Sequence, residues 1–348
     1  MSDHANRRWL LAARPQGPID ESIFSRVEEP VPVPGAGEFL VRVTHLSFDP
    51  TQRGWLSGDT YIPAVPIGSV VRAAAAGQVV QSNHPKFKPG QLVQGAFGWQ
   101  DYAVSNGTTD IGAVAHLPEG ATAEAALSVF GITGLTAYFG LNEIGKPQPG
   151  ETVLVSAAAG ATGSIAVQLA KAAGCKVIGI AGGAEKCGWV RDVAGADACI
   201  DYKNENVWRQ LSKLAPQGVN VIFENVGGEI LEAGLMSLAM HGRVILCGGI
   251  SSYETSNPRD QKGVRFLLNL TMKRARMEGF IVLDYEPRYG EAIAALSALI
   301  ASGKLKSVED VQHGFENIPA TLNRLFRGQN IGKQLLKLAD PPLTVVSG

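Results

Sequence analysis

A turn of small residues, placed between an apolar run and a helical pattern, has the spacing best suited to chemistry. After the run at 153–155, Gly160 and Gly163 stand three residues apart, and Ala158 occupies the place of a first glycine. Small side chains let backbone N–H groups approach a pyrophosphate, and a helix N-terminus places partial positive charge on it. A strand before and a helix after this G-x-G-x-x-G-like spacing favour a dinucleotide site over the alternative, a buried turn without ligand. The residues expected to bind the pyrophosphate are Gly160, Ala161, Thr162 and Gly163.

The chain beyond this turn indicates which dinucleotide is bound. In an NAD enzyme, an Asp or Glu about 20 residues past the glycine turn binds the ribose 2′-hydroxyl. This chain has Gly182 and Gly183 there, with Lys186 just beyond. A 2′-phosphate then meets no like-charge repulsion, and the Lys186 ammonium can neutralise it. The pattern favours NADP(H). The alternative for Lys186 is a solvated lysine in the first helical turn, a place that the helix dipole disfavours for a cation.

The composition is that of a soluble enzyme. A chain of 348 residues is long enough for two domains, and 45% hydrophobic with 18% charged residues is ordinary for a globular protein. A net charge of −1 offers no field for nucleic acid or anionic membrane. No run reaches the ~20 apolar residues of a membrane span, and the run at 9–13 is too short for a signal peptide. The 4 cysteines lack C-x-x-C spacing, so we expect reduced thiols, no disulfide and a cytoplasmic location.

Two patterns of elements divide the chain. Residues 1–126 are β-rich, with short strands at 38–46, 68–73 and 77–80, which predicts a small barrel. Residues 127–300 alternate strands with helices, which predicts an α/β fold with a doubly wound, mostly parallel Rossmann sheet. Residues 301–348 are expected to return to the first domain. The strands expected in the second domain are 152–156, 176–181, 198–200, 219–224, 243–247 and 278–282, and the helices 163–173, 185–194, 228–239 and 289–301.

Zinc catalysis is not expected. A catalytic zinc needs about three convergent Cys, His or carboxylate ligands, and a structural zinc about four cysteines. The first domain has no cysteine, and His45, His84 and His116 have no suitably spaced partners. His45 lies in an alternating strand pattern, where a structural histidine is the better interpretation than a ligand. We therefore predict no metal.

Further motifs resemble one enzyme family over nearly the whole chain. Together with the glycine turn, they are similar to the zinc-independent medium-chain dehydrogenase/reductases, in the branch of prostaglandin reductases, leukotriene dehydrogenases and NADPH-dependent alkenal and enone double-bond reductases. The resemblance implies a GroES-like first domain and a homodimer joined through the edge strand of the Rossmann sheet. The motifs lie at 46–50 with 53–54, 157–164, 185–186, 201–203, 224–228, 247–253, 276–280 and 314–319.

The resemblance also implies roles for individual residues. Lys186 and Tyr202 would hold the adenosine phosphate end of the cofactor, and a second group would line its nicotinamide half. The strand-end rule for open α/β sheets agrees, since Asn225 and Cys247 each follow a strand. Asn225 is otherwise an ordinary turn residue. The nicotinamide group comprises Asn225, Cys247, Gly248, Gly249, Ile250, Ser251, Ser252, Phe280, Val282 and Asn330.

Two residues depart from the pattern of this family. Gly183 stands where the branch usually has a serine, so one hydroxyl contact to a 2′-phosphate is missing. Thr51 stands where many members have a substrate-pocket tyrosine, which implies a different or roomier pocket. Tyr61 or Trp55 can replace the lost surface. We predict that Thr51, Arg53 and Tyr61 line the substrate pocket.

Without a metal, the substrate must be polarised by a hydrogen-bond donor. Reduction of an α,β-unsaturated carbonyl places a hydride on the β carbon, and a donor near the carbonyl oxygen stabilises the developing enolate. Tyr253 is the candidate catalytic donor because a phenol is neutral at pH 7. The alternative role of Tyr253 is an aromatic wall of the cofactor site.

The leading hypothesis is thus an NADPH-dependent reductase of alkenals and enones. A second hypothesis is NADPH-dependent quinone reduction, and a third is a nucleotide-binding protein without turnover. The partners expected are a small-molecule substrate and a second copy of the chain, with no nucleic acid and no membrane.

Overall fold

The computed structural model describes residues 5–255 and 263–343, which form two compact units. Unit 1 comprises Met1–Leu127, Glu309–Asn330 and Gln334–Gly348, and unit 2 comprises Ser128–Val308 and Ile331–Lys333. The expected boundaries followed residues 126 and 300. Residues 301–308, expected in the returning segment, belong to unit 2.

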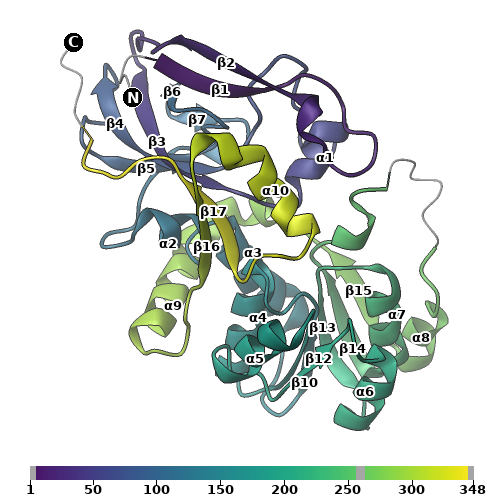
Figure 1. Cartoon of the computed structure of the whole chain (residues 1–348). Helices are drawn as coiled ribbons and strands as arrows, with labels where there is room; N and C mark the ends of the chain where they lie inside the picture. Colours follow the sequence, from purple (N-terminus) through teal and green to yellow (C-terminus); the bar gives the residue numbers. More distant parts are fainter. Residues whose placement is uncertain (1–4, 256–262, 344–348) are drawn as a thin grey trace. The chain divides into compact units, whose positions relative to one another are not determined.

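Unit 2 is built on a six-stranded sheet in the order β12-β11-β10-β13-β14-β15, with parallel neighbours (Figure 1). From the central pair the chain winds outward in both directions, so right-handed crossovers place the β10–β11 and β13–β14 helices on opposite faces. The α/β doubly wound fold predicted from the alternating pattern is confirmed. The strands are β10 (Thr152–Val155), β11 (Lys176–Ala181), β12 (Ala198–Asp201), β13 (Val219–Glu224), β14 (Leu238–Leu246) and β15 (Arg276–Gly279).

Helices cover this sheet through apolar side chains. Leu211 of α6 and Leu231 and Leu235 of α7 pack on strand residues such as Ile178 and Ile222, all buried. Burial of such side chains is the main favourable term in folding. The helical segments of unit 2 are α3 (Ile132–Phe139), η2 (Gly140–Gly145), α4 (Ala161–Ala172), α5 (Ala184–Asp192), α6 (Val207–Leu214), α7 (Gly228–Met236), η3 (Ile250–Ser252), α8 (Leu268–Lys273), η5 (Val282–Arg288) and α9 (Tyr289–Ala301).

Two expected elements of unit 2 end early. The helix expected at 228–239 stops at Met236 because the chain turns at Ser237 and enters β14 at Leu238. The strand expected at 278–282 stops at Gly279, and Val282 begins the short helix η5. Neither change moves the carboxyl ends of β10, β13 and β14, where the predicted site residues follow.

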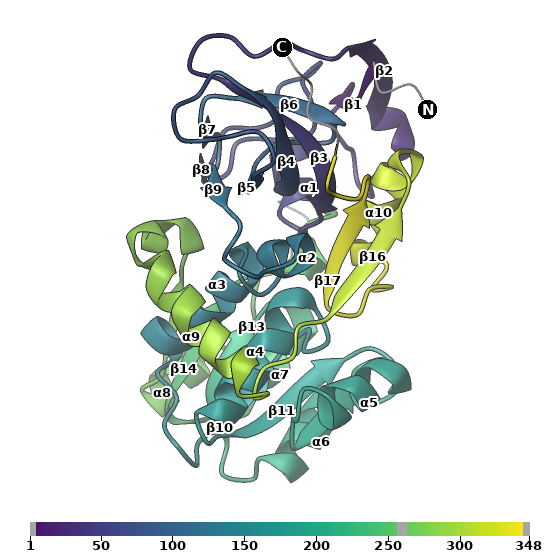
Figure 2. The same ribbon diagram turned by 90° about the vertical axis from the view of Figure 1, so that its left-hand side faces the viewer.

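Unit 1 is β-rich, as expected. Its main sheet has the order β16-β17-β3-β4-β5-β9, and β6 also pairs with β3; Figure 2 shows β16 and β17 side by side. Its core contains Phe39, Phe48, Trp99 and Phe315, all nearly inaccessible to solvent. The elements are β1 (Ala5–Leu11), η1 (Glu21–Ile23), β2 (Phe24–Pro30), β3 (Phe39–Ser47), α1 (Gln52–Ser57), β4 (Ala75–Ser82), β5 (Leu92–Gly95), β6 (Tyr102–Ser105), β7 (Thr108–Thr109), β8 (Gly112–Ala113), β9 (Ala115–His116), α2 (Ala123–Leu127), β16 (Glu309–His313), η6 (Phe315–Asn317), α10 (Ile318–Phe326) and β17 (Lys333–Lys337).

The strand expected at 68–73 is wrong. Only an isolated bridge from Val70 to Leu10 forms there. The backbone of Val71 instead pairs with two different segments, donating to Trp9 O (3.0 Å) and accepting from Trp99 N (3.0 Å). Across the described residues, no helix has the length and apolar character that a bilayer crossing requires.

Candidate functional site

The glycine turn brings backbone unusually close to backbone. A Cβ on Gly163 would lie 2.2 Å from Ala157 O, an impossible contact, and one on Gly160 would lie 3.2 Å from the same oxygen. Ala158, in the first glycine position, is fully buried and donates its N–H to Ile180 O (2.9 Å), so this position accommodates a methyl group. The turn therefore requires glycine only where helix α4 crosses the end of β10.

The start of α4 fits an anion. Gly160 caps the helix without a side-chain hydrogen bond, and no acidic residue occurs in the first turn. The first N–H groups of a helix have no intrahelical acceptor and carry partial positive charge. Gly332 N–H donates to Ala159 O (2.7 Å) and fixes the turn from its other side. The predicted residues Gly160, Ala161, Thr162 and Gly163 thus form a cradle that fits a pyrophosphate.

At the end of β11, one carboxylate organises the loop expected to meet the 2′-phosphate. Asp201 accepts hydrogen bonds from Gly183 N (2.8 Å) and Lys203 N (3.1 Å), and Asn204 Nδ2 donates to its other oxygen (2.7 Å). The Gly183 N–H is the main reason that the pKa of Asp201 lies below its ordinary value. Gly183 has φ +97°, a conformation that favours glycine over the serine usual in the family.

Two side chains lie over Gly182 at this strand end. A Cβ on Gly182 would be 2.9 Å from Tyr202 Cε1 and 3.0 Å from Lys203 Cε. Tyr202 is 47% exposed, and Lys186 is in the first turn of α5. Lys203 received no role from the sequence, although it belongs to a motif that supports the resemblance. The sequence signal for a role of Lys203 was its position directly after Tyr202, just past the end of the parallel strand β12.

A second network joins the ends of β10 and β13. Asn225 N–H donates to Ser156 Oγ (2.8 Å), and Asn225 Nδ2 donates to Ser156 O (2.7 Å). Glu224 Oε1 accepts from both Val226 N and Gly227 N, each at 2.6 Å. Burial raises the pKa of Glu224, and the hydrogen bonds from these two N–H groups partly offset the rise. Ser156 and Glu224 had no predicted role, although the sequence places a polar residue at the end of an apolar run at both positions.

The chain after β14 folds back on this network. Cys247 N–H and Gly248 N–H both donate to Glu224 O (2.9 and 3.1 Å), and Ile250 N–H donates to Asn225 O (3.2 Å). Ser251 Oγ–H donates to Val226 O (2.6 Å) and Ser252 Oγ–H to Gly249 O (2.8 Å). The structure thus brings together Asn225 and the predicted residues Cys247, Gly248, Gly249, Ile250, Ser251 and Ser252.

Tyr253 closes this loop with its hydroxyl. Gly249 N–H donates to Tyr253 Oη (3.2 Å), an interaction that uses an oxygen lone pair and leaves the phenol hydrogen to donate. Burial raises the pKa of Tyr253, so the phenol stays protonated at neutral pH. The geometry is compatible with a donor.

Phe280 and Val282 turn their side chains inward. A Cβ on Gly140 would be 2.8 Å from Phe280 Cζ, and Val282 is buried beside Phe139. Val282 is buried and Phe280 is half-buried, and the contact of this segment with the cofactor stays a prediction. Asn330 is a buried residue of unit 1, and its contact with the nicotinamide stays a prediction.

The predicted substrate-pocket residues lie around α1 in unit 1. Thr51 Oγ1 and Tyr61 Oη are hydrogen-bonded (3.1 Å), and the Trp55 and Tyr61 rings are 6.5 Å apart, edge to face. Arg53 is buried and donates to Gly17 O (2.6 Å) and to Ser57 Oγ, so its guanidinium supports the loop. The substrate contacts of Thr51, Arg53 and Tyr61 stay predictions.

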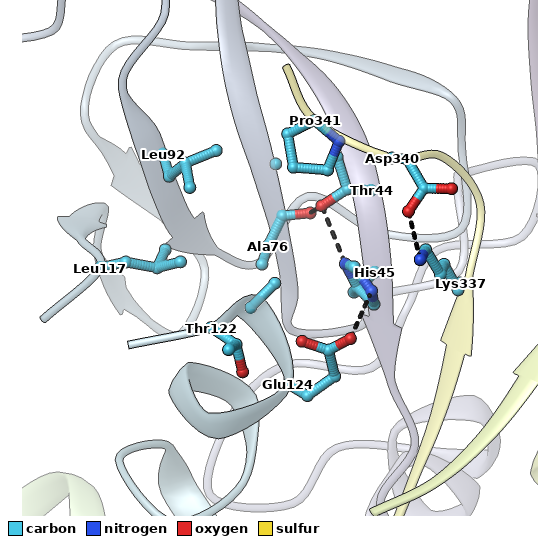
Figure 3. A pocket seen from close by; sticks show the side chains of 12 residues that line it. Thr44, His45, Ala76, Leu92, Leu117, Thr122, Glu124, Lys337, Asp340 and Pro341 are labelled. Atoms are coloured by element: carbon cyan, nitrogen blue, oxygen red, sulfur yellow. Dashed lines mark hydrogen bonds and ion pairs between the residues drawn. The ribbon is translucent and has the colours of Figure 1, made fainter. Parts of the chain in front are cut away.

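His45 faces a small pocket of unit 1 that is lined by both polar and apolar side chains (Figure 3). Its Nδ1 is 3.1 Å from Thr44 Oγ1 and its Nε2 is 3.2 Å from Glu124 Oε1. Burial lowers the pKa of His45, despite the nearby Glu124 carboxylate. Within the described ranges, no cluster of three or more His, Cys, Asp or Glu side chains is placed to hold a metal.

The chain matches two families of oxidoreductase domains. Residues 7–112 match the family described as the N-terminal domain of oxidoreductase, and residues 161–298 match the family described as zinc-binding dehydrogenase. The chain is 39% identical to the NADPH-dependent curcumin reductase of Escherichia coli, over 96% of this chain and 97% of that protein. It is 37% identical to the 2-alkenal reductase (NADP(+)-dependent) of Nicotiana tabacum, over 88% of each chain.

A solved structure agrees in fold. CurA of Vibrio vulnificus in complex with NADPH is 38% identical, with a TM-score of 0.90, and the similarity covers 96% of this chain and 100% of that one.

Glu224→Ala tests the network behind the cofactor loop. The substitution leaves the Val226 and Gly227 N–H groups without their acceptor, at a cost of about 1–3 kcal/mol. We expect the Kd for NADPH, measured by fluorescence titration, to rise about tenfold. Glu224→Gln keeps an acceptor oxygen and should restore most of the affinity.

Glu291→Ala is the matched control, because Glu291 is an exposed carboxylate of unit 2 that pairs with Arg288. Wild-type affinity in Glu224→Ala, or equal losses in the Ala and Gln variants, would contradict this role for Glu224.

Proposed function

The chain belongs to the enone-reductase branch of the medium-chain dehydrogenase/reductase superfamily, and we propose that it reduces the C=C bond of α,β-unsaturated aldehydes and ketones with NADPH. The observation that carries the proposal is the turn at Gly160 and Gly163, whose helix N-terminus fits a pyrophosphate, together with Lys186 at the start of α5 and Lys203 after β12. This combination occurs in a chain 39% identical to a reductase whose name states its dependence on NADPH. No metal is required by this chemistry.

Each part of the site has a distinct task in this reaction. When bound, NADPH supplies the hydride that adds to the β carbon of the substrate. The N–H groups at the start of α4 hold the pyrophosphate, while Lys186, Tyr202 and Lys203 surround the 2′-phosphate. Tyr253 donates its phenol hydrogen to the substrate carbonyl oxygen as negative charge develops there. The raised pKa of Tyr253 suits a donor, because the group never has to be protonated first.

Tyr253→Phe removes this donor. We expect kcat for a small enone to fall by roughly 10- to 1000-fold, as is typical when one donor to a developing oxyanion is deleted. NADPH affinity should change little, because solvent can pair the partly exposed Gly249 N–H. Stopped-flow or steady-state oxidation of NADPH, with enones and quinones as parallel substrates, measures both effects.

Tyr138→Phe serves as the control, because the Tyr138 hydroxyl donates to the exposed Glu291 and lies outside the proposed site. An unchanged kcat in Tyr253→Phe would remove this residue from the mechanism. Turnover of quinones but not of enones would overturn the proposed enone reduction in favour of quinone reduction. Tight NADPH binding without any turnover would favour a non-catalytic protein.

Lys186→Ala and Lys203→Ala test the choice of cofactor. Each removes a cation that we assign to the 2′-phosphate, a group absent from NADH. The KM for NADPH should rise about tenfold in either variant, while the KM for NADH stays nearly constant. Lys176→Ala is the matched control, since Lys176 donates to Leu214 O at the other end of β11. A parallel rise in both KM values would argue against recognition of the 2′-phosphate.

A homodimer joined through β15 is the proposed assembly. Strand β15 ends the sheet of unit 2, and exposed apolar side chains of the neighbouring α8 include Leu268 (67% exposed) and Met272 (54%). An unpaired edge beside an apolar surface is a ready pairing site. We expect dimers in analytical ultracentrifugation and monomers for Leu268→Glu/Met272→Glu, with Val33→Glu in unit 1 as control. A wild-type monomer would refute the dimer.

We also propose a cytoplasmic location, supported by the four free thiols and testable by cell fractionation.

A further inference from the structure

Two cysteines that the proposed mechanism does not use lie in contact with each other. Cys187 on α5 and Cys199 on β12 have their sulfur atoms 3.1 Å apart, with the Cys199 S–H donating to Cys187 Sγ. Both are free thiols; Cys187 is 3% exposed and Cys199 is partly exposed. A disulfide needs its sulfur atoms about 2.05 Å apart, so roughly 1 Å of approach separates this pair from a covalent bond.

The pair lies directly behind the loop assigned to the 2′-phosphate. Cys187 follows Lys186 in the first turns of α5, and Cys199 precedes Asp201 by two residues on β12. Asp201 in turn holds Gly183 N–H at 2.8 Å, just before α5 begins. Any movement of α5 toward β12 is therefore transmitted to the residues expected to bind the phosphate.

Space around the sulfur atoms is limited. A Cβ on Gly179 of β11, the strand paired with β12, would lie 3.6 Å from Cys199 Sγ and 2.7 Å from Val190 Cγ1. Cys187 Sγ is 3.9 Å from Ala181 O on the same strand. The two thiols are thus enclosed by β11 and α5, and the partly exposed Cys199 provides the route for a small reagent.

We propose that Cys187 and Cys199 form a reversible intramolecular disulfide, with hydrogen peroxide as the oxidant, and that this bond weakens the binding of NADPH. The thiolate of Cys199 attacks the peroxide O–O bond, an S–O bond forms, and hydroxide leaves. Cys187 then attacks the resulting sulfenic acid, forming the S–S bond and releasing the second oxygen as water. Two thiols lose two electrons in total, and the peroxide is reduced to two molecules of water. An external dithiol reverses the reaction by thiol–disulfide exchange.

The environment of the pair sets its reactivity. Burial raises the pKa of both thiols, so at neutral pH they remain protonated and the disulfide forms slowly. The reactive thiolate fraction of a thiol rises about tenfold per pH unit below its pKa. Oxidation at pH 9 should accordingly be much faster than at pH 7.

Peroxide treatment of the full-length wild-type chain tests the bond itself. Thiol titration after denaturation should fall from the four cysteines of the sequence to two. Peptide mass mapping should find one linked pair, Cys187 with Cys199, about 2 Da lighter than the two thiols. Dithiothreitol should restore four thiols. Four thiols after treatment, a different linked pair, or oxidation that dithiothreitol fails to reverse would overturn the proposal.

Single substitutions distinguish the attacking thiol, Cys199, from the resolving thiol, Cys187. In Cys187→Ser, the sulfenic acid of Cys199 has no resolving thiol and should be trapped by dimedone, whereas Cys199→Ser should give no labelled Cys187. Cys175→Ser is the matched control, because Cys175 is buried in the same unit and its thiol donates to Gln148 O. That variant should form the disulfide as the wild type does. Equal labelling in both Cys187→Ser and Cys199→Ser would contradict the assigned order of attack.

The effect on NADPH rests on the proposed function, whereas the disulfide does not. In the oxidised chain, displacement of Lys186 and Gly183 should raise the KM for NADPH about threefold to tenfold, with kcat at saturating NADPH unchanged. Cys187→Ser should lose this response to peroxide. A mapped disulfide with an unchanged KM would refute the link to the cofactor. A chain that oxidises no NADPH at all, yet forms the disulfide, would refute the proposed function alone.

Discussion

The candidate site depends on the close approach of two backbone segments at the end of β10. Because a Cβ on Gly163 would sit 2.2 Å from Ala157 O, helix α4 can begin against the strand end only when position 163 is glycine. That contact aims the first N–H groups of α4 at the edge of the sheet. The topology then places the ends of β13 and β14 at the same edge, since parallel strands of a doubly wound sheet end together. The loop that contains Tyr253 follows from this arrangement.

Side-chain acceptors hold the loops in place around this turn. Glu224 binds two successive backbone N–H groups, Ser156 binds the N–H of Asn225, and Asp201 binds the N–H of Gly183. None of these three acceptors is assigned to the ligand. The buried acceptors Glu224 and Ser156 satisfy backbone groups that would otherwise cost about 1–3 kcal/mol each when left unpaired, and Asp201 fixes the more accessible Gly183 loop. The loops are consequently ordered before any cofactor arrives, which lowers the entropy lost on binding.

The structure also changes the meaning of several predicted residues. Phe280 and Val282 pack into unit 2, so their side chains support the site from within. Arg53 donates to Gly17 O, which makes it part of the scaffold around α1. Sequence patterns cannot distinguish such support from ligand contact, because the same residue type at the same strand end can face either way. The direction depends on packing partners that are distant in the sequence.

Local patterns were sufficient for most of the alternating elements of unit 2 and for the glycine turn, since periodicity and turn chemistry act over a few neighbouring residues. They failed at 68–73, where the backbone of Val71 makes one hydrogen bond to Trp9 of β1 and one to Trp99, so that no continuous ladder forms. They also gave no sign that Cys187 and Cys199 touch, or that Glu224 reaches Val226 and Gly227 from within the core. Such contacts arise only when strands and helices stack. The burial of a side chain and its distance from residues far away in the sequence are therefore decided by the tertiary structure, whereas turns and helices are indicated by neighbouring residues in the sequence.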